Sequence, residues 1–282
     1  MPFAVVTDST AYLPQGFADR HAVRVVPLLV HLDGREFRDG VDLGPGELAE
    51  ALNRHRAVTT SRPNPAEFIA EYRSLLDAGA DGVLSVHLSR ELSGTWESAR
   101  LAAEEVGSDR VRVVDSRTTA MGLGFAALRA AAVAATGAGG AEVEAVAVAA
   151  AEHTRSFFVV ETLDHLRRGG RIGAAAALMG SALAVKPLLH VHDGRIVPLE
   201  KVRTTSRALG RLVDLAVEAA GDGRVELAVH HLAAPDRAAE VAARLDERVP
   251  NSSGCVVSEL GSVIGAHTGP GVIGVVVCPG RL

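Results

Sequence analysis

Hydroxyl side chains gather at four places where a predicted strand or helix ends. These places are Thr7-Asp8-Ser9-Thr10, Thr59-Thr60-Ser61, Ser89 to Thr95, and Ser116 with Thr118-Thr119. Because the carboxyl ends of parallel strands meet at one edge of a sheet, we expect these hydroxyls to form one rim. Each of them alone would equally suit a cap or a turn. Taken together, neutral donors without an obvious bidentate arginine favour one carboxylate over a polyphosphate.

Ser93 adds a helix terminus to this predicted rim. It precedes the helical pattern TWESARLAAEEV and is predicted to be the N-cap of that helix. The free N–H groups and the positive end of the helix dipole would then favour an anion beside Ser93.

His267 stands in the stretch SVIGAHTGPGVIGVVV, where we predict a glycine-rich turn between two apolar runs. Such a turn lets the backbone approach a ligand closely. The imidazole could donate or accept one hydrogen bond, or neutralise a carboxylate as a cation. Two alternatives are a histidine satisfied within the core, and a triad-like grouping with Asp8 and Ser93.

Dinucleotide and metal sites have weaker support. Gly122 to Ala127 fits a loose G-x-G-x-x-A pattern, but it lies beyond the strand end and lacks an acidic residue at the ribose spacing. His190 with His192, and His230 with His231, lack a spaced third ligand. No G-x-S-x-G, H-E-x-x-H or Walker A sequence occurs. We therefore expect no metal and no cofactor.

The composition limits the possible partners. The 282 residues are 48% hydrophobic and carry a formal net charge of -5, without a block of Lys or Arg. A nucleic-acid or anionic-membrane surface is therefore not expected. The N-terminus has no secretory pattern, and charged residues interrupt the apolar tract 120–151, so we expect a soluble cytoplasmic protein.

Strand and helix patterns alternate in the first half of the chain. Strands are predicted at residues 3–7, 23–32, 82–88 and 110–115, and helices at 45–56, 65–78 and 93–106. This order predicts an open α/β domain with a mostly parallel sheet and helices on both faces.

The second half has a different pattern. After two Ala-rich helices and a strand at 156–162, Asp193-Gly194 predicts a two-residue hairpin within 187–202. Further helices are predicted from about Ser206 and after Pro235, and strands at 224–232, 254–260 and 271–278. We predict an N-terminal α/β domain of residues 1–155 and a C-terminal α+β domain of residues 156–282, with a tight interface.

The motifs together resemble the DegV family of bacterial proteins. They are TDST (7–10), TTSRP (59–63), LSGTWESA (92–99), VVDSRTTAMGLG (113–124), ETLDHLRRGGRIG (161–173), GSALAVKPLL (180–189), EKVRT (200–204) and IGAHTGPGVIG (264–274). The resemblance covers nearly the whole chain. It implies a two-domain protein that holds one long-chain fatty acid in a buried tunnel between the domains.

The resemblance also implies roles for particular residues. The fatty-acid carboxylate would contact Thr60 or Ser61, Ser93 with Gly94, and His267. Some members present this carboxylate to a separate dihydroxyacetone-kinase-like, ATP-dependent fatty-acid kinase, which makes the acyl phosphate. Arg171 and Arg203 would face that partner, although a solvated basic surface is the alternative for both. We expect Met121, Leu123, Ile172, Leu178 and Met179 to line the tunnel.

Two positions depart from the family pattern. Arg62 stands where the family often has Gln, and Trp96 where it usually has Tyr. Arg62 puts a cation beside the predicted head group, where it could bind the carboxylate or face a partner.

The leading hypothesis is a non-catalytic fatty-acid-binding protein that acts with a kinase. One alternative is an enzyme for a small carbonyl or phosphorylated substrate, related to the dihydroxyacetone kinases. Another is a lipid sensor without a kinase.

Overall fold

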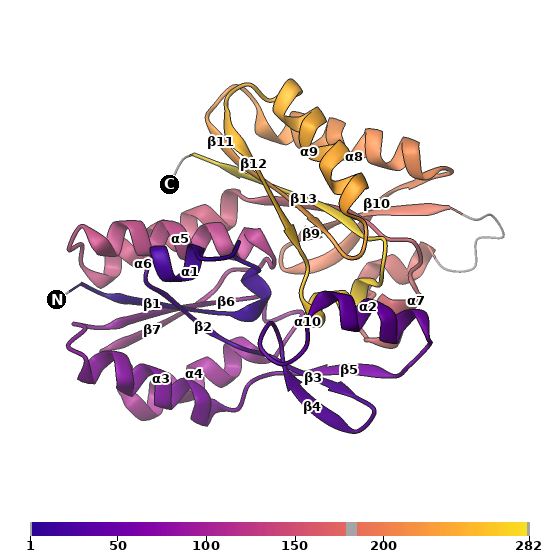
Figure 1. Cartoon of the computed structure of the whole chain (residues 1–282). Helices are drawn as coiled ribbons and strands as arrows, with labels where there is room; N and C mark the ends of the chain where they lie inside the picture. The colour runs from indigo at the N-terminus through magenta and orange to yellow at the C-terminus, as the bar shows by residue number, and fades with distance from the viewer. Residues whose placement is uncertain (1, 179–184, 281–282) are drawn as a thin grey trace.

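The protein is represented by a computed structural model that describes residues 2–178 and 185–280 (Figure 1). Within these residues the strands form three sheets of four, six and three strands. The arrangement is a mixed α/β fold, as the sequence predicts.

The four-stranded sheet lies in the first half of the chain, and all its strand pairs are parallel. Its order is β2 (Val23–Val26), β1 (Ala4–Asp8), β6 (Val83–His87) and β7 (Val111–Asp115). Figure 1 shows helices α3 (Pro65–Asp77) and α4 (Thr95–Val106) on one face, with α5 (Met121–Ala135) and α6 (Gly140–His153) on the other. The predicted parallel sheet covered on both faces is therefore confirmed.

Helices α5 and α6 also contact the second sheet. Their small side chains, including the buried Ala127, Ala130 and Ala147, share one core with Ala228 and Val276 of that sheet. Small residues allow helices and strands to approach closely. The same two helices thus form a packed layer between the two large sheets.

The six-stranded sheet lies in the second half. Its order is β10 (Arg195–Val202), β9 (Lys186–His192), β8 (Arg155–Val159), β13 (Ile273–Pro279), β11 (Val225–His231) and β12 (Ser252–Glu259). The last strand, β13, is central and antiparallel to both β8 and β11. Helices α8 (Thr205–Ala220) and α9 (Pro235–Arg248) pack on its outer face.

The Asp193-Gly194 hairpin is confirmed. It joins β9 to the antiparallel β10, and both turn residues have positive φ, 49° and 79°. A two-residue turn of this kind needs φ above zero at both positions, which Asp and Gly tolerate.

A small antiparallel sheet corrects the prediction of one strand over residues 23–32. Pro27 separates β2 from β3 (Leu29–Leu32), and β3 pairs instead with β4 (Arg35–Arg38) and β5 (Val58–Ser61). Asp33 and Gly34, with φ of 51° and 75°, make the β3–β4 turn. Asp33-Gly34 thus forms a hairpin of the same Asp-Gly type, which the prediction of one strand did not include.

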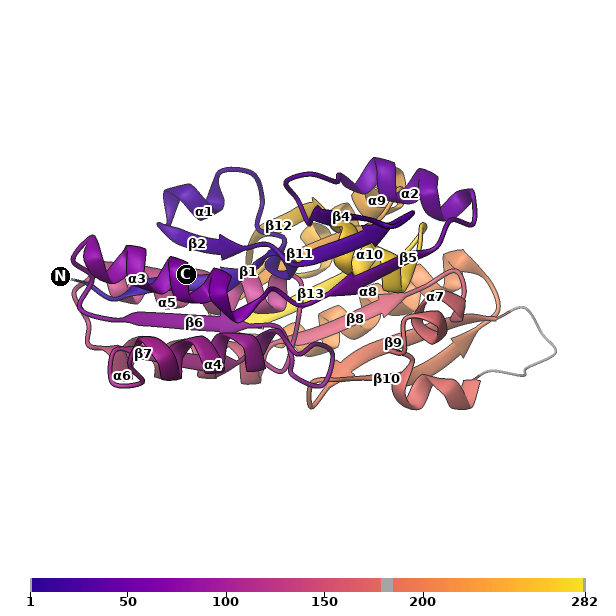
Figure 2. The ribbon, with the colours of Figure 1, turned by 90° about the horizontal axis from the view of Figure 1, so that it is seen from below.

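Short helices lie between these strands. They are η1 (Ser9–Ala11), α1 (Phe17–Arg20), α2 (Pro45–Asn53), α7 (Asp164–Arg168), η2 (Gly173–Leu178) and α10 (Ser262–Thr268). The glycine-rich turn predicted around His267 is wrong, because His267 lies in the last turn of α10. Figure 2 shows α10 beside β5, with β8 and β9 nearby.

The boundary near Ser156 stays a prediction. The four-stranded sheet ends at Asp115, and β8, the first strand of the six-stranded sheet, begins at Arg155. Among the described residues, no helix has the length and apolar character that crossing a membrane requires.

Candidate functional site

A cavity of about 460 Å³ lies between the inner face of the six-stranded sheet and elements that include β5, α7 and α10. This volume is in the usual range for a site that encloses a small organic ligand. Its apolar lining includes Leu28, Leu88, Leu92, Phe158, Leu166, Val191, Ile196, Leu260, Val263, Ile264, Val272 and Val276. Such a lining suits an aliphatic chain.

The predicted lining residues are wrong where the structure describes them. Met121 and Leu123 are fully buried in the core formed with α5 and α6, away from the cavity wall. Ile172 and Leu178 pack against the neighbouring core without lining the cavity. Met179 lies outside the described residues. Core and cavity residues are both apolar, so composition alone could not separate them.

All five residues predicted to contact a carboxylate line this cavity. Thr60, Ser61, Ser93, Gly94 and His267 come from β5, from the segment before α4, and from α10. Three segments distant in the sequence thus meet at the polar end of the cavity.

Thr60 and His267 form a direct contact. Thr60 lies opposite Val30 in the β3–β5 ladder, and its Oγ1 is 2.8 Å from Nε2 of His267. Because strand residues alternate between faces, Ser61 is directed differently, and its Oγ is 2.8 Å from Nε2 of His31. The structure therefore distinguishes two neighbouring hydroxyls that the sequence left as alternatives.

The His267 side chain is partly buried, and its second nitrogen, Nδ1, is enclosed by protein. A Cβ on Gly169 would lie only 1.9 Å from Nδ1, and within the described part of the chain Nδ1 has no hydrogen-bond partner. Burial, and secondarily the charge of Arg171, lowers the pKa of His267 to about 4. The imidazole is therefore neutral at pH 7, which disfavours the predicted cation.

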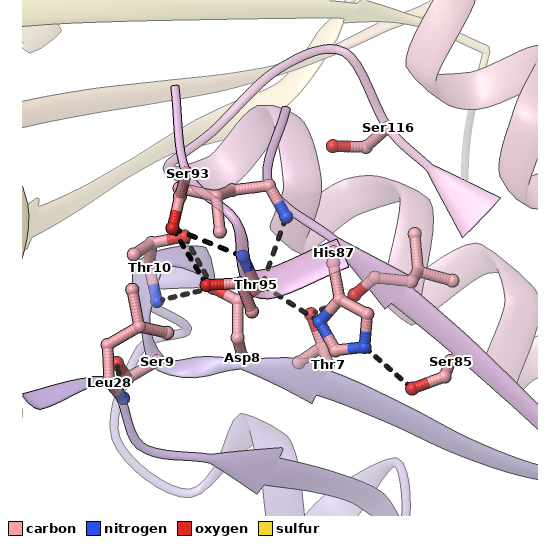
Figure 3. A network of polar contacts seen from close by, with 12 residues as sticks. Thr7, Asp8, Ser9, Thr10, Leu28, Ser85, His87, Ser93, Thr95 and Ser116 are labelled. Carbon is pink, nitrogen blue, oxygen red and sulfur yellow. Dashed lines mark hydrogen bonds and ion pairs between the residues drawn. The ribbon is translucent and has the colours of Figure 1, made fainter. Parts of the chain in front are cut away.

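Ser93 does not cap α4. Gly94 occupies the N-cap position, while Ser93 Oγ accepts a hydrogen bond from Thr95 N at 3.3 Å and lies 2.9 Å from Thr95 Oγ1 (Figure 3). Sequence reasoning placed the cap one residue too early. Ser93 and Gly94 nevertheless both line the cavity beside the start of a 12-residue helix.

Two arginines contact the same segment. Arg171 donates from Nε to Leu92 O at 2.9 Å and from Nη1 to Gly169 O at 2.7 Å. Arg62 donates from Nη1 to Gly94 O at 3.3 Å, and both arginines line the cavity. Arg203 is exposed between β10 and α8, apart from these contacts.

Asp39 and Tyr12 hold the start of α10, and sequence reasoning missed both. Asp39 Oδ1 accepts from Ser262 N at 2.7 Å, and Tyr12 Oη accepts from Ile264 N at 3.0 Å. Tyr12 in turn donates to Asp39 Oδ2 at 3.2 Å. Burial raises the pKa of Asp39 although these donors oppose the shift. The pair positions the helix that carries His267, but nothing local in the sequence marks it.

Of the other predicted rim hydroxyls, Thr119 lines the cavity and the rest do not. Asp8 accepts from Thr10 N and Leu88 N, each at 3.0 Å, and its Oδ2 is 3.0 Å from His87 Nδ1 (Figure 3). His87 Nε2 continues to Ser85 Oγ at 2.7 Å. These side chains are fully buried. Asp8 thus pairs with His87, and the triad-like grouping with His267 is wrong.

The glycine pattern of residues 122–127 and the His190-His192 pair both lie within regular elements of the fold. Gly122 and Gly124 lie inside α5, where added side chains would meet Thr118 and Met121. The rings of His190 and His192 stack at 5.4 Å on β9. Among the residues described, no group of three His, Cys, Asp or Glu could hold a metal ion.

The fold and cavity define a class of α/β proteins with a largely apolar cavity that contains a cluster of polar groups. A family model described as "Uncharacterised protein, DegV family" matches residues 2–280, and the chain belongs to the DegV family. A DegV domain-containing protein of Streptomyces coelicolor is 55% identical over 274 residues, which cover 97% of each chain.

Solved structures agree with this assignment. A fatty-acid-binding DegV family protein from Thermus thermophilus has a TM-score of 0.93 and 36% identity, with 99% of this chain and 100% of that chain covered. DegV of Bacillus subtilis, described as a fatty acid binding protein, has a TM-score of 0.90 and 34% identity at the same coverage.

Proposed function

We propose that this protein binds one long-chain fatty acid in the cavity and presents its carboxylate to a separate ATP-dependent kinase. The observation that carries the proposal is the apolar cavity with Thr60, Ser93 and His267 at one end. The fatty-acid binding described for the two related structures supports the same ligand class. In this proposal the chain itself has no catalytic role.

The polar end supplies a directed hydrogen-bond chain. A carboxylate can only accept, so Thr60 must donate its hydroxyl proton to the ligand. Thr60 Oγ1 then accepts from His267 Nε2–H across the observed 2.8 Å contact. His267 thus acts through Thr60 as a neutral donor, in agreement with its lowered pKa. The Ser93 hydroxyl provides a second donor from the opposite segment.

The apolar walls supply most of the affinity. Each buried methylene contributes about 0.8 kcal/mol, so a long chain outweighs the few polar contacts. The polar contacts instead fix which end of the ligand lies beside Ser93 and Gly94. A carboxylate held there would be accessible for phosphoryl transfer because neighbouring Arg62 is solvent-exposed.

The partner in this proposal is a dihydroxyacetone-kinase-like fatty-acid kinase. Exposed Arg203 provides a docking charge, while Arg171 belongs partly to the cavity wall. The reaction would occur in the cytoplasm, with transient membrane contact at most and without nucleic acid.

Native mass spectrometry of the purified protein, followed by denaturing extraction, tests lipid binding. We expect one fatty acid per chain, and weaker oleate binding by about tenfold in Thr60→Val, because one hydrogen bond to a charged group is lost. Thr136→Val is the matched control, because it is the same substitution at an exposed threonine that bonds Val133 O and does not line the cavity. An apo mass unchanged by incubation with fatty acids would contradict the proposal.

The same preparation separates the rival functions. Acyl-phosphate formation that requires the chain, lipid, ATP and kinase together would support presentation to a kinase. Turnover of a small carbonyl or phosphorylated substrate by the chain alone would favour the enzyme. Retained lipid without stimulation of a kinase would favour the sensor.

A further inference from the structure

Two guanidinium groups lie on either side of Ser93 at the polar end of the cavity. Arg171 contacts the carbonyl of Leu92, and Arg62 contacts the carbonyl of Gly94. A Cβ on Gly94 would lie 2.7 Å from Arg62 Nη1, so the guanidinium rests directly against this glycine. The segment that precedes α4 therefore lies between two positively charged side chains.

This charge has no carboxylate partner within the described part of the chain. Arg62 and Arg171 form their hydrogen bonds with main-chain carbonyls, which carry no formal charge. Glu97 lies close enough for Arg62 to influence it, but Glu97 is paired with Arg100 at 2.7 Å. Two cations thus line a cavity whose other walls are mainly apolar.

The neighbouring titratable group does not contribute to this charge. His267 is partly buried and lies next to Arg171, an arrangement that disfavours a proton on the ring. Arginine remains charged at any physiological pH. Any preference of the polar end for a negatively charged ligand therefore depends on Arg62 and Arg171.

Arg62 is the more adaptable of the two. Arg171 is partly buried and makes two hydrogen bonds, whereas Arg62 is exposed and makes one hydrogen bond of 3.3 Å. A guanidinium held this weakly can turn from Gly94 O towards a ligand oxygen next to Ser93, and a charged acceptor would be the stronger partner.

We infer that Arg62 is a specificity-determining residue, which makes the cavity prefer single-chain lipids with an anionic head group over uncharged lipids of equal length. The inference rests on the proposed function, since it concerns the head group of the lipid bound there. Its chemistry is one charge-assisted contact to a carboxylate, in addition to the donors Thr60 and Ser93.

The test compares oleate with oleamide, which has the same chain and an uncharged head group. Calorimetric titration of the delipidated full chain should show that Arg62→Gln weakens oleate binding about three- to fivefold, the range for an exposed ion pair. Oleamide binding should stay the same. Added NaCl should weaken oleate binding to the original chain more than to the variant, because salt screens exposed charges.

Two further variants make the result specific. Arg62→Lys keeps the charge and should restore part of the preference for oleate. Arg90→Gln is the matched control, because Arg90 is exposed near the same rim, pairs with Asp115 and stacks over Trp96, but does not line the cavity. It should leave both affinities unchanged.

The possible outcomes separate the two proposals. Equal weakening of oleate and oleamide by Arg62→Gln would make Arg62 a structural support of α4 and overturn the inference. Unchanged oleate binding would overturn it as well, while lipid binding itself would stand. Failure of the original chain to bind either lipid would overturn the proposed function instead.

Discussion

Two histidine networks in this protein use the same residue types in opposite ways. Around His87, Asp8 accepts from three neighbours, and both ring nitrogens of His87 have partners. Around His267, only Nε2 has a partner among the described residues, and the network ends at a cavity. A closed network stabilises the fold, whereas an open one leaves hydrogen-bonding capacity for a ligand.

The comparison also explains why a hydroxyl-rich motif in the sequence does not always become part of the cavity. The TDST motif predicts a functional rim as strongly as TTS does, yet its Asp8 and Thr10 bond to each other, and Asp8 also bonds His87 of β6. The difference lies in whether a cavity reaches the side chains. Residue type alone cannot reveal this.

Removing the carboxylate from the closed network should have the largest effect. Asp8→Ala leaves four buried donor atoms, from Thr10, His87 and Leu88, without their acceptor, so we expect a loss of about 3–5 kcal/mol in the free energy of unfolding. Urea denaturation measures this loss. A decrease below 1 kcal/mol would mean that the network is not a structural support.

Acidification should destabilise the protein through His230 and His267. The pKa values of His230 and His267 are lowered to about 4 from the ordinary value of 6.5, mainly by burial. Between these values the unfolded chain binds more protons than the folded one, so stability falls as pH falls. Each histidine contributes about 1.4 kcal/mol per pH unit in this window, or about 3 kcal/mol by pH 4.

Urea denaturation at several pH values from 7 to 4 measures this dependence. His267→Gln should make it shallower, because one of the two titrating groups is removed. Equal pH dependence in the variant and the original chain would contradict the assigned protonation of His267.

Gly169→Ala should break the hydrogen bond between His267 and Thr60, and of these variants it should change the stability of the fold least. The new methyl group would occupy the position of Nδ1, so the ring must move away. We expect about tenfold weaker oleate binding, equivalent to one lost hydrogen bond to a charged group.

Gly46→Ala in α2 is the control, since an added Cβ there meets nothing within 4 Å. Circular dichroism should give the same spectrum for both variants. If Gly169→Ala binds oleate normally, the position of the His267 ring is unimportant for binding.

Local sequence patterns predicted the large elements well. Asp193-Gly194 gave the hairpin, and the alternation of strands and helices gave the parallel sheet, because both signals depend on neighbouring residues. The division of residues 23–32 at Pro27 was missed, although proline cannot donate to a ladder.

The details of the site depend on contacts between distant segments. Thr60 and His267, which are in contact, lie 207 positions apart in the sequence. Asp39 and Ser262, which share a hydrogen bond, lie 223 positions apart. The sequence also gave no sign that the histidine lies on a helix, because α10 has only seven residues and contains Gly265. That glycine packs closely against Leu48 and Leu232, a tertiary reason that the pattern cannot display.

The central place of β13 has a consequence for the order of events during synthesis. This strand comes last among the described elements, yet it pairs with β8 and β11 and supplies Gly274 and Val276 to the cavity wall. A growing chain on the ribosome therefore exposes a sheet with its middle strand missing. The cavity can first enclose a ligand when β13 has left the ribosomal exit tunnel and paired with β8 and β11.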